Sequence, residues 1–243
     1  MVKTGADEID VWFWTLDVEP GRRAALREIL TAEEQARADR FAFPILRERW
    51  TAARAGLRSI LSQYVGGAPS ALRFSLSEHG KPSFEAADAP HFNLTHAEGY
   101  AALAVAGSPV GVDLEKLGEA HADVAQTHFS PQEAAVFAAT PPERQVAAFY
   151  RCWTAKEAFL KALGTGFSQP SDSFTIDFAP DAPIALTEAD WLGGEVGDWR
   201  FWPFQPHPEF VGAVCLRRPQ GALVCARYDW SPDGSTRVGR AWQ

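Results

Sequence analysis

The chain has few cysteines, little methionine and no long hydrophobic run. Only three of its 243 residues are cysteine, and none forms a Cys-x-x-Cys pair, which argues against a disulfide framework or a zinc knuckle and favours a reducing, cytoplasmic setting. A single methionine argues against a flexible, methionine-lined binding surface. No stretch approaches the roughly 18–20 apolar residues of a membrane span, and the early acidic residues do not fit a signal peptide. We therefore expect no membrane partner.

Basic residues are also in the minority. The chain has 23 Lys and Arg against 31 Asp and Glu, a formal net charge of −8 and a pI of about 5.3. General nucleic-acid binders are usually basic, so no nucleic-acid partner is expected. What the chain does have is nine Trp, sixteen Phe and 46% hydrophobic residues, which indicate a globular protein with a stiff aromatic core. Its length corresponds to about 1.6 average domains, so one large domain or two small ones.

Hydrophobic periodicity and turn residues predict a mixture of helices, strands and hairpins. Helices are expected to begin near Thr31, as an incomplete capping box, and at Ser130, as a complete one. From 174 to 228 the pattern is one of short strands with Pro and Gly turns. This mixture predicts an α+β architecture of two halves that divide near 107–109. The other expected strands cover 9–16, 72–76, 92–96, 100–106 and 110–115, and the long helices cover 47–64 and 145–163.

Two segments carry acidic residues in patterns that suit metal chemistry. Asp113 and Glu115 end a predicted strand, where they share one face about 6.6 Å apart and form half of a site for a hard cation. Taken alone, this pair is better explained as a polar strand end in water. Trp153, Glu157 and Lys161 share one face of the second long helix, one turn apart. A carboxylate near apolar neighbours needs a partner or a metal, although an ordinary exposed Glu–Lys pair is the common alternative.

Arginines are concentrated in one part of this acidic chain. Such a cluster suits a phosphate-rich ligand because guanidinium groups match phosphate oxygens, while a solvated helix face is the alternative. Lys81 on a tight turn and His96 after a strand are common anion contacts, and equally common surface residues. The arginines of the cluster are Arg37, Arg40, Arg47, Arg49, Arg54 and Arg58.

Four segments, taken in order, are far more specific than any one of them. They resemble the 4′-phosphopantetheinyl transferase superfamily, and the length and the arginine-rich stretch are similar to its surfactin-activator (Sfp-like) type. The resemblance covers roughly 30–170 and implies two similar lobes in a pseudo-twofold arrangement with the active site between them. The expected division is 1–108, with the coenzyme A phosphate contacts, and 109–243, with the metal site and catalytic helix. The segments are Gly80-Lys81-Pro82, Phe92-Asn93-Leu94-Thr95-His96, Val110-Gly111-Val112-Asp113-Leu114-Glu115 and 153–161 (Trp-Thr-Ala-Lys-Glu-Ala-Phe-Leu-Lys).

The resemblance implies a reaction and a partner. A serine of an apo acyl or peptidyl carrier protein receives 4′-phosphopantetheine from coenzyme A, and 3′,5′-ADP leaves. The ion is expected to be Mg²⁺, with Mn²⁺ as an alternative, bound by Asp113, Glu115 and Glu157. Glu157 is also expected to accept the serine proton, directly or through a water molecule, and Lys161 to stabilise charge on the phosphate. The enzyme is expected to be a monomer.

The resemblance further implies contacts with coenzyme A and with the carrier. Arg49 and His96 are placed toward the 3′-phosphate. Glu133 matches a recurrent family glutamate, which the capping box explains equally well. The full set of expected coenzyme A contacts is Arg49, Arg54, Lys81, Pro82, Thr95, His96 and Lys156. The region between the metal strand and the metal helix offers Phe129, Val136 and Phe137 as candidate carrier contacts, although each of them alone is better explained as a core-facing helix residue.

Two other functions compete with this interpretation. A carboxylate-dependent nuclease would also use acidic pairs and a lysine, but the acidic balance of the chain disfavours it. A non-catalytic carrier-binding or nucleotide-binding module would not need the full set of Asp113, Glu115, Glu157 and Lys161.

Overall fold

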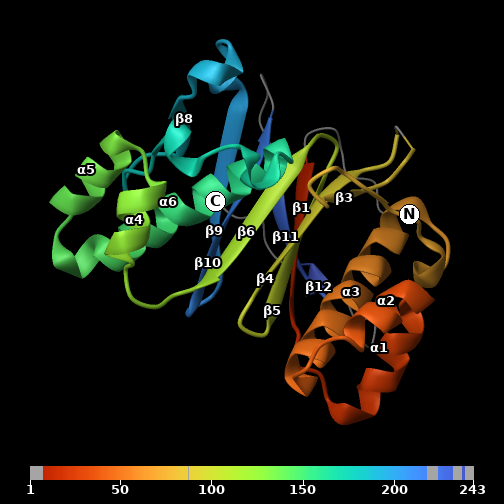
Figure 1. The fold of residues 1–243 in the computed structure, drawn as a ribbon. Helices are drawn as coiled ribbons and strands as arrows, with labels where there is room; N and C mark the ends of the chain where they lie inside the picture. The colour runs from red at the N-terminus through yellow and green to blue at the C-terminus, as the bar shows by residue number, and fades with distance from the viewer. Residues whose placement is uncertain (1–7, 87, 218–223, 232–236, 239–243) are drawn as a thin grey trace. The chain divides into compact units, whose positions relative to one another are not determined.

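The computed structural model describes residues 8–86, 88–217, 224–231 and 237–238 (Figure 1). The chain forms two compact units: unit 1 comprises Met1–Leu76, Pro82–Gly107 and Leu223–Gln243, and unit 2 comprises Ser77–Lys81 and Ser108–Ala222. The chain passes into unit 2 at the turn predicted near 107–109. The units differ from a simple division into 1–108 and 109–243, because two further segments belong to the other unit. Both units mix helix and sheet, as expected of an α+β protein.

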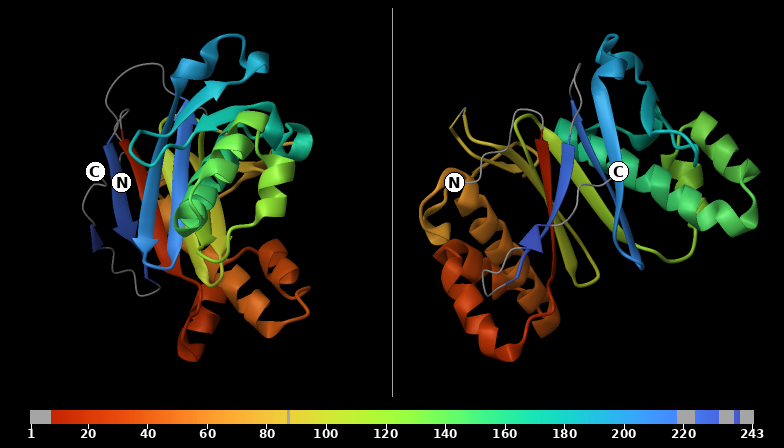
Figure 2. Two further views of the ribbon diagram at one scale, coloured as in Figure 1. Left: turned by 90° about the vertical axis from the view of Figure 1, so that its left-hand side faces the viewer. Right: turned by 180° about the vertical axis from the view of Figure 1, so that it is seen from behind.

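Unit 1 is built on a five-stranded sheet in the order β12-β11-β1-β5-β4. β1 pairs antiparallel with β5 and parallel with β11, and Figure 2 shows β11 beside β1. Local sequence cannot reveal this parallel pairing, since its two strands are more than 200 residues apart. The strands are β1 (Glu8–Thr15), β4 (His91–Ala97), β5 (Tyr100–Ala106), β11 (Val224–Asp229) and β12 (Arg237–Val238), with a separate hairpin of β2 (Ser75–Leu76) and β3 (Pro82–Ser83).

The helices of unit 1 bury its aromatic core against this sheet. Trp12 and Trp14 of β1 lie in one cluster with Leu57 and Ile60 of α3. Gly56 is required there, because a Cβ on it would lie 2.7 Å from the Trp14 ring. The helical elements are η1 (Pro20–Arg22), α1 (Arg23–Ile29), α2 (Ala32–Ala38), α3 (Pro44–Val65) and η2 (Pro69–Ala71).

The helix expected near Thr31 begins with a complete capping box, not an incomplete one. The Thr31 hydroxyl accepts a hydrogen bond from the Glu34 backbone N–H, and the Glu34 carboxylate accepts one from the Thr31 N–H. Glu34 is the third helical residue, the position at which a capping-box glutamate is expected.

Unit 2 places one long helix, α6 (Pro142–Leu163), against a three-stranded sheet in the order β6-β10-β9. The helix and β6 lie unusually close, since a Cβ on Gly111 would come within 2.0 Å of the Ala158 carbonyl oxygen. The helix ends as predicted: Gly164 follows it in the left-handed conformation. The strands are β6 (Val110–Lys116), β9 (Trp199–His207) and β10 (Phe210–Arg217).

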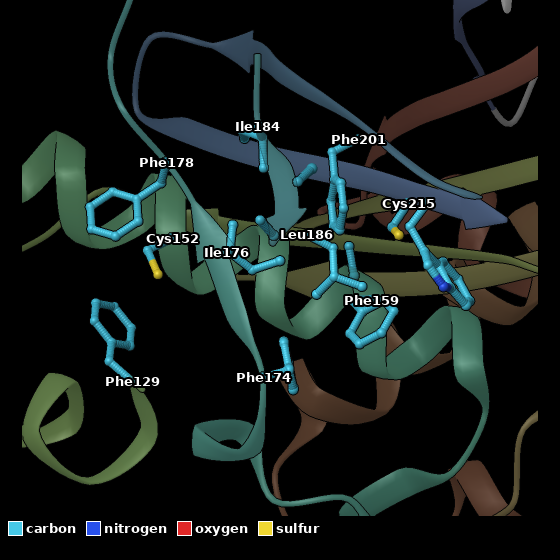
Figure 3. Packing of buried hydrophobic residues seen from close by; sticks show 14 of the residues in the cluster. Phe129, Cys152, Phe159, Phe174, Ile176, Phe178, Ile184, Leu186, Phe201 and Cys215 are labelled. Atoms are coloured by element: carbon cyan, nitrogen blue, oxygen red, sulfur yellow. The ribbon is translucent and has the colours of Figure 1, made fainter. Parts of the chain in front are cut away.

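Shorter elements cover the other side of α6. Figure 3 shows Phe159 of α6, Ile176 of β7 and Leu186 of β8 packed together in the core of this unit. In the part of the chain that the structure describes, no helix combines the length and hydropathy needed to cross a bilayer. These elements are α4 (Ala122–His128), α5 (Pro131–Ala139), η3 (Gly166–Ser168), η4 (Ser171–Ser173), β7 (Thr175–Asp177), β8 (Ala185–Glu188), η5 (Asp190–Leu192) and η6 (Glu195–Asp198).

Candidate active site

The predicted acidic residues of β6 and the predicted face of α6 meet in unit 2. Lys161 Nζ donates a hydrogen bond to Asp113 Oδ1 at 2.5 Å, and Trp153 Nε1 donates one to Glu115 Oε1 at 3.1 Å. Asp113 is only 3% exposed, and its Oδ2 is buried with no hydrogen-bond partner among the described residues. Strand and helix are thus joined by two side-chain hydrogen bonds, next to one buried carboxylate oxygen that lacks a donor.

Glu115 and Glu157 hold their protons more tightly than a carboxyl group usually does, because the pKa of each is raised. Burial raises the pKa of Glu157, and the Asp113 carboxylate raises it further, against the opposing charges of Lys161 and His128. Burial also raises the pKa of Glu115, followed by repulsion from Asp113, while the Trp153 hydrogen bond lowers it. Asp113 therefore repels the charged forms of both glutamates across this cluster.

The donor set suits a hard divalent cation. Asp113, Glu115 and Glu157 offer only oxygen ligands, and the partnerless Oδ2 of Asp113 is an acceptor that a cation would satisfy. Within the described residues no group of three or more His, Cys, Asp or Glu side chains is already gathered as a metal cage. Mg²⁺ usually takes one or two protein carboxylates and fills its other positions with water and substrate phosphate oxygens. The residues therefore fit Mg²⁺ without a preformed cage.

Two contacts around the cluster do not follow from the sequence. Trp153 lies on the helix face of Glu157, as predicted, but helical spacing does not predict its hydrogen bond to Glu115 on the strand. The ring of His128, from α4, lies edge-on to Trp153 at a centroid distance of 5.7 Å, and its Nδ1 lies 3.0 Å from Ser171 Oγ. The sequence offers no signal for His128, because its place depends on how α4 packs.

The structure places Lys156 differently from the sequence prediction. It is 0% exposed, and its Nζ donates to both carboxylate oxygens of Glu133, at 2.8 and 2.6 Å, and to the Phe174 carbonyl oxygen at 2.9 Å. The expected contact between Lys156 and coenzyme A is wrong, because no part of the side chain reaches the surface. Glu133 also accepts hydrogen bonds from the backbone N–H groups of Ser130 and Ile176, so the capping box expected at Ser130 is confirmed, and the same carboxylate holds the buried ion pair with Lys156.

The ammonium group of Lys81 forms hydrogen bonds with backbone carbonyl groups of unit 2. Its Nζ donates to the carbonyl oxygens of Val110 at 3.1 Å, Lys161 at 2.5 Å and Ala162 at 3.4 Å. Burial lowers its pKa to about 8. The ammonium group therefore caps the C-terminal end of α6, where the helix dipole favours positive charge. The expected contact of Lys81 with coenzyme A stays a prediction. Pro82, the next residue, begins β3 and is half-buried.

Arg54 and Arg58 hold a buried carboxylate in unit 1. Arg54 Nη2 lies 2.7 Å from Glu34 Oε1, and Arg58 Nε lies 2.6 Å from Glu34 Oε2. Burial by itself would raise the pKa of Glu34, but the Arg58 hydrogen bond and the Arg54 charge outweigh it and lower that pKa. These arginines connect α2 to α3, and the expected contact of Arg54 with coenzyme A stays a prediction.

Arg49 and His96 lie on the same side of the unit 1 sheet. Alternation along β4 places His96 on the face of Phe92 and Leu94, which pack in the cluster that contains α3 residues. Arg49 is on α3, and its side chain is 31% exposed. Thr95 is buried and belongs to the opposite face of β4. Of the expected coenzyme A contacts, Arg49 and His96 are therefore the pair that the fold brings to one side.

Two of the three expected carrier contacts are core residues. Phe129 and Phe137 are 3% and 6% exposed and pack with Phe149, so the core-facing alternative holds for both and neither is a surface contact. Val136 is 53% exposed on α5. Its contact with a carrier stays a prediction.

Comparison with known proteins agrees with the resemblance seen in the sequence. The family model of the 4′-phosphopantetheinyl transferase superfamily matches residues 109–215, which include β6 and α6. Among solved structures, holo-[acyl-carrier-protein] synthase of Thermotoga maritima is similar over 48% of this chain and 66% of its own, with a TM-score of 0.36 and 17% identity. That similarity is too distant to place residues.

Characterised relatives match most of the chain. The 4′-phosphopantetheinyl transferase HetI of Nostoc sp. is 33% identical over 233 residues, covering 93% of this chain and 91% of HetI. A 4′-phosphopantetheinyl transferase of Bacillus subtilis is 32% identical over 163 residues, covering 67% of this chain and 71% of that protein. The chain is therefore an enzyme that belongs to the 4′-phosphopantetheinyl transferase superfamily.

Proposed function

We propose that the protein transfers 4′-phosphopantetheine from coenzyme A to a serine of an apo acyl or peptidyl carrier protein, with release of 3′,5′-ADP and with dependence on Mg²⁺. The observation that carries this proposal is the buried, partnerless Oδ2 of Asp113 beside Lys161 of α6. A buried acceptor without a donor costs free energy unless a ligand satisfies it, so it marks a site of binding rather than of stability.

The residues of unit 2 divide the chemistry among them. Asp113 and Glu115 would hold the ion together with Glu157, and bound Mg²⁺ would neutralise charge on the pyrophosphate oxygens. Glu157, whose pKa is raised by burial and by Asp113, accepts the proton of the attacking serine hydroxyl. The serine Oγ–P bond forms as the P–O bond to 3′,5′-ADP breaks. Lys161 donates hydrogen bonds to the phosphate oxygens.

The residues of unit 1 contribute to coenzyme A binding. Arg49 is a partly exposed arginine on the side of the sheet that carries His96, and a guanidinium group matches a phosphate monoester in charge and geometry. We assign these two residues to the 3′-phosphate. Val136, exposed on α5, is the apolar side chain assigned to the carrier protein.

A transfer assay tests the proposal directly. Purified protein is incubated with coenzyme A, Mg²⁺ and an apo peptidyl carrier protein, and the carrier is analysed by intact mass spectrometry. We expect a mass gain of one phosphopantetheine, lost when EDTA is added and restored by excess Mg²⁺. Glu157→Gln should lower the rate about 10²- to 10⁴-fold without changing the circular dichroism spectrum.

The matched control is Glu143→Gln. Glu143 lies on the same helix but in its exposed first turn, so its loss should leave the rate unchanged. A carrier whose mass does not change would overturn the proposed reaction. Full activity of Glu157→Gln would overturn the proposed site while leaving the reaction in place.

A further inference from the structure

The side chain of Arg49 is bound along one edge only. Its Nε and Nη2 donate to Oδ1 and Oδ2 of Asp17, at 2.7 and 3.0 Å, which forms a side-on, two-bond ion pair. A guanidinium group has five N–H donors, and this pair uses two of them. Within the described residues no acceptor is recorded for Nη1, so the end-on fork of Nη1 and Nη2 stays available to a second anion.

The carboxylate of Asp17 is held in place by the turn between β4 and β5. The Leu16 backbone N–H donates to the Gly99 carbonyl oxygen at 2.6 Å. A Cβ on Gly99 would lie 2.9 Å from Asp17 Oδ2 and 3.0 Å from Arg49 Nη2. The ion pair therefore packs closely against the backbone of this glycine. The same turn follows His96 after one residue, Ala97. Arg49 is therefore fixed beside the strand end that carries the other residue assigned to the 3′-phosphate.

The turn itself is strained. Glu98 has a φ of 39°, which places it in the left-handed region, and among the described residues it is the single non-glycine with a positive φ. Backbone strain of this kind persists where the surroundings fix it, often at binding sites. The Asp17 hydrogen bond raises the pKa of Arg49, and the negative charge of Glu98 raises it by a smaller amount.

A neighbouring carboxylate is kept away from Arg49. Glu48, the preceding residue of α3, is paired with Arg23. Both ion pairs line one hollow of about 250 Å³, whose apolar walls include Leu16 and Ile45. Because Glu48 has its own cation, Asp17 is the carboxylate that accepts hydrogen bonds from the Arg49 guanidinium, while Glu98 acts on it through charge.

We propose that Asp17 is a positioning residue for Arg49: it fixes the side-on edge of the guanidinium so that the end-on fork meets the 3′-phosphate, and it thereby sets the discrimination between coenzyme A and 3′-dephospho-coenzyme A. This inference rests on the proposed function, in which Arg49 contacts that phosphate. The carboxylate lowers the local positive charge, but it removes the rotamer freedom that a long side chain would otherwise lose on binding.

Calorimetry with the two ligands tests this role. In Asp17→Asn we expect the Kd for coenzyme A to rise about two- to tenfold, the range that corresponds to ordering one long side chain. The Kd for 3′-dephospho-coenzyme A should stay within about twofold, since that ligand lacks the group that Arg49 meets. In the transfer assay KM for coenzyme A should rise while kcat and the melting temperature stay unchanged.

Two controls separate positioning from a general charge effect. Glu19→Gln removes a carboxylate from the wall of the same hollow, one that makes no recorded bond to Arg49, and should leave both dissociation constants unchanged. In an Arg49→Ala background Asp17→Asn should have no further effect, because a positioning residue acts only through its partner.

Contrary outcomes are distinct. Tighter binding of coenzyme A by Asp17→Asn would show that Asp17 competes with the phosphate, and equal weakening for both ligands would show a merely structural role. Either result overturns the positioning role while leaving the proposed function intact. If Arg49→Ala does not change the ratio of the two dissociation constants, the assignment of Arg49 fails and this inference fails with it.

Discussion

Lys156 is a buried charged residue that contributes to the stability of the fold and does not contact the ligand. Its ammonium and the Glu133 carboxylate are both completely buried and satisfy each other. Burial lowers the pKa of Lys156, an effect that the Glu133 charge opposes. A buried pair of this kind adds little net stability while intact, because its mutual attraction offsets the desolvation of both charges, but losing one partner leaves an uncompensated charge. Lys156 therefore acts on the stability of unit 2 and not on coenzyme A.

Replacing this lysine tests that distinction. Lys156→Met keeps the length of the side chain but leaves the Glu133 carboxylate without a counter-charge. We expect the free energy of unfolding to fall by about 3–5 kcal/mol, measured by urea denaturation. KM for coenzyme A should stay unchanged at temperatures where the variant is folded, because Lys156 does not reach the ligand.

The double variant Glu133→Gln, Lys156→Met is the control. It removes both charges, so it should be more stable than Lys156→Met alone. A raised KM for coenzyme A with unchanged stability would contradict this account and restore the phosphate contact expected from the sequence.

At the scale of elements, the site depends on how closely β6 approaches α6. Asp113 and Glu115 are on the strand, and Lys161 and Trp153 reach them from the helix. Gly111 permits this approach, because the atoms that a Cβ would meet belong to the helix backbone and cannot rotate away. The geometry of the site is thus set by a residue that carries no functional group.

Gly111→Ala should separate the two elements. A Cβ would lie 2.0 Å from the Ala158 carbonyl oxygen and 2.4 Å from the Ala162 nitrogen, so the helix must shift. We expect a loss of about 1–3 kcal/mol in the free energy of unfolding, or more, as for other overpacked interiors. Transfer activity should fall by more than the fraction of unfolded protein accounts for, since the hydrogen bond from Lys161 to Asp113 lengthens.

The control is Gly197→Ala, whose Cβ would meet nothing within 4 Å. It should retain both stability and activity. Wild-type activity in Gly111→Ala would mean that the spacing of β6 and α6 does not determine the site.

The sequence predicted which strand and helix carry the site residues, but it did not predict what packs against those elements. The motif order placed Asp113, Glu115, Glu157 and Lys161 on the correct strand and helix, because local spacing determines which face a side chain occupies. Spacing does not say what lies opposite that face. Lys156, next to Glu157, turns toward Glu133 in the core, and periodicity alone could not distinguish it from a surface lysine.

At the scale of the whole molecule, the path of the chain determines which segments belong to each unit. It begins in unit 1, forms unit 2, and returns to unit 1 through β11, which pairs with β1. Local patterns correctly predicted short strands after 174, but they could not assign one of them to the first sheet. The expected lobe of 109–243 failed at this point, because strand pairing across such a separation depends on the tertiary fold.

Trp230, just after β11, completes the core of unit 1. It is 6% exposed, its backbone N–H donates to the Phe13 carbonyl oxygen at 3.2 Å, and its ring lies edge-on to that of Trp14 at a centroid distance of 5.8 Å. Removing a buried tryptophan side chain costs about 3–5 kcal/mol. Because Trp230 packs in the cluster of unit 1, that cost should fall on this unit and leave the cluster around α6 intact.

Trp230→Ala should therefore loosen unit 1 selectively. We expect hydrogen-exchange mass spectrometry to show faster exchange in peptides from β1 and β5, with β6 and α6 remaining protected, since exchange reports the stability of each cooperative unit. Trp191→Ala is the matched control: this tryptophan is 39% exposed in unit 2 and should leave β1 and β5 unchanged. Equal loss of protection in both units would show that they unfold as one, and the return of the chain to unit 1 would then stabilise the whole enzyme, including the helix that carries Glu157.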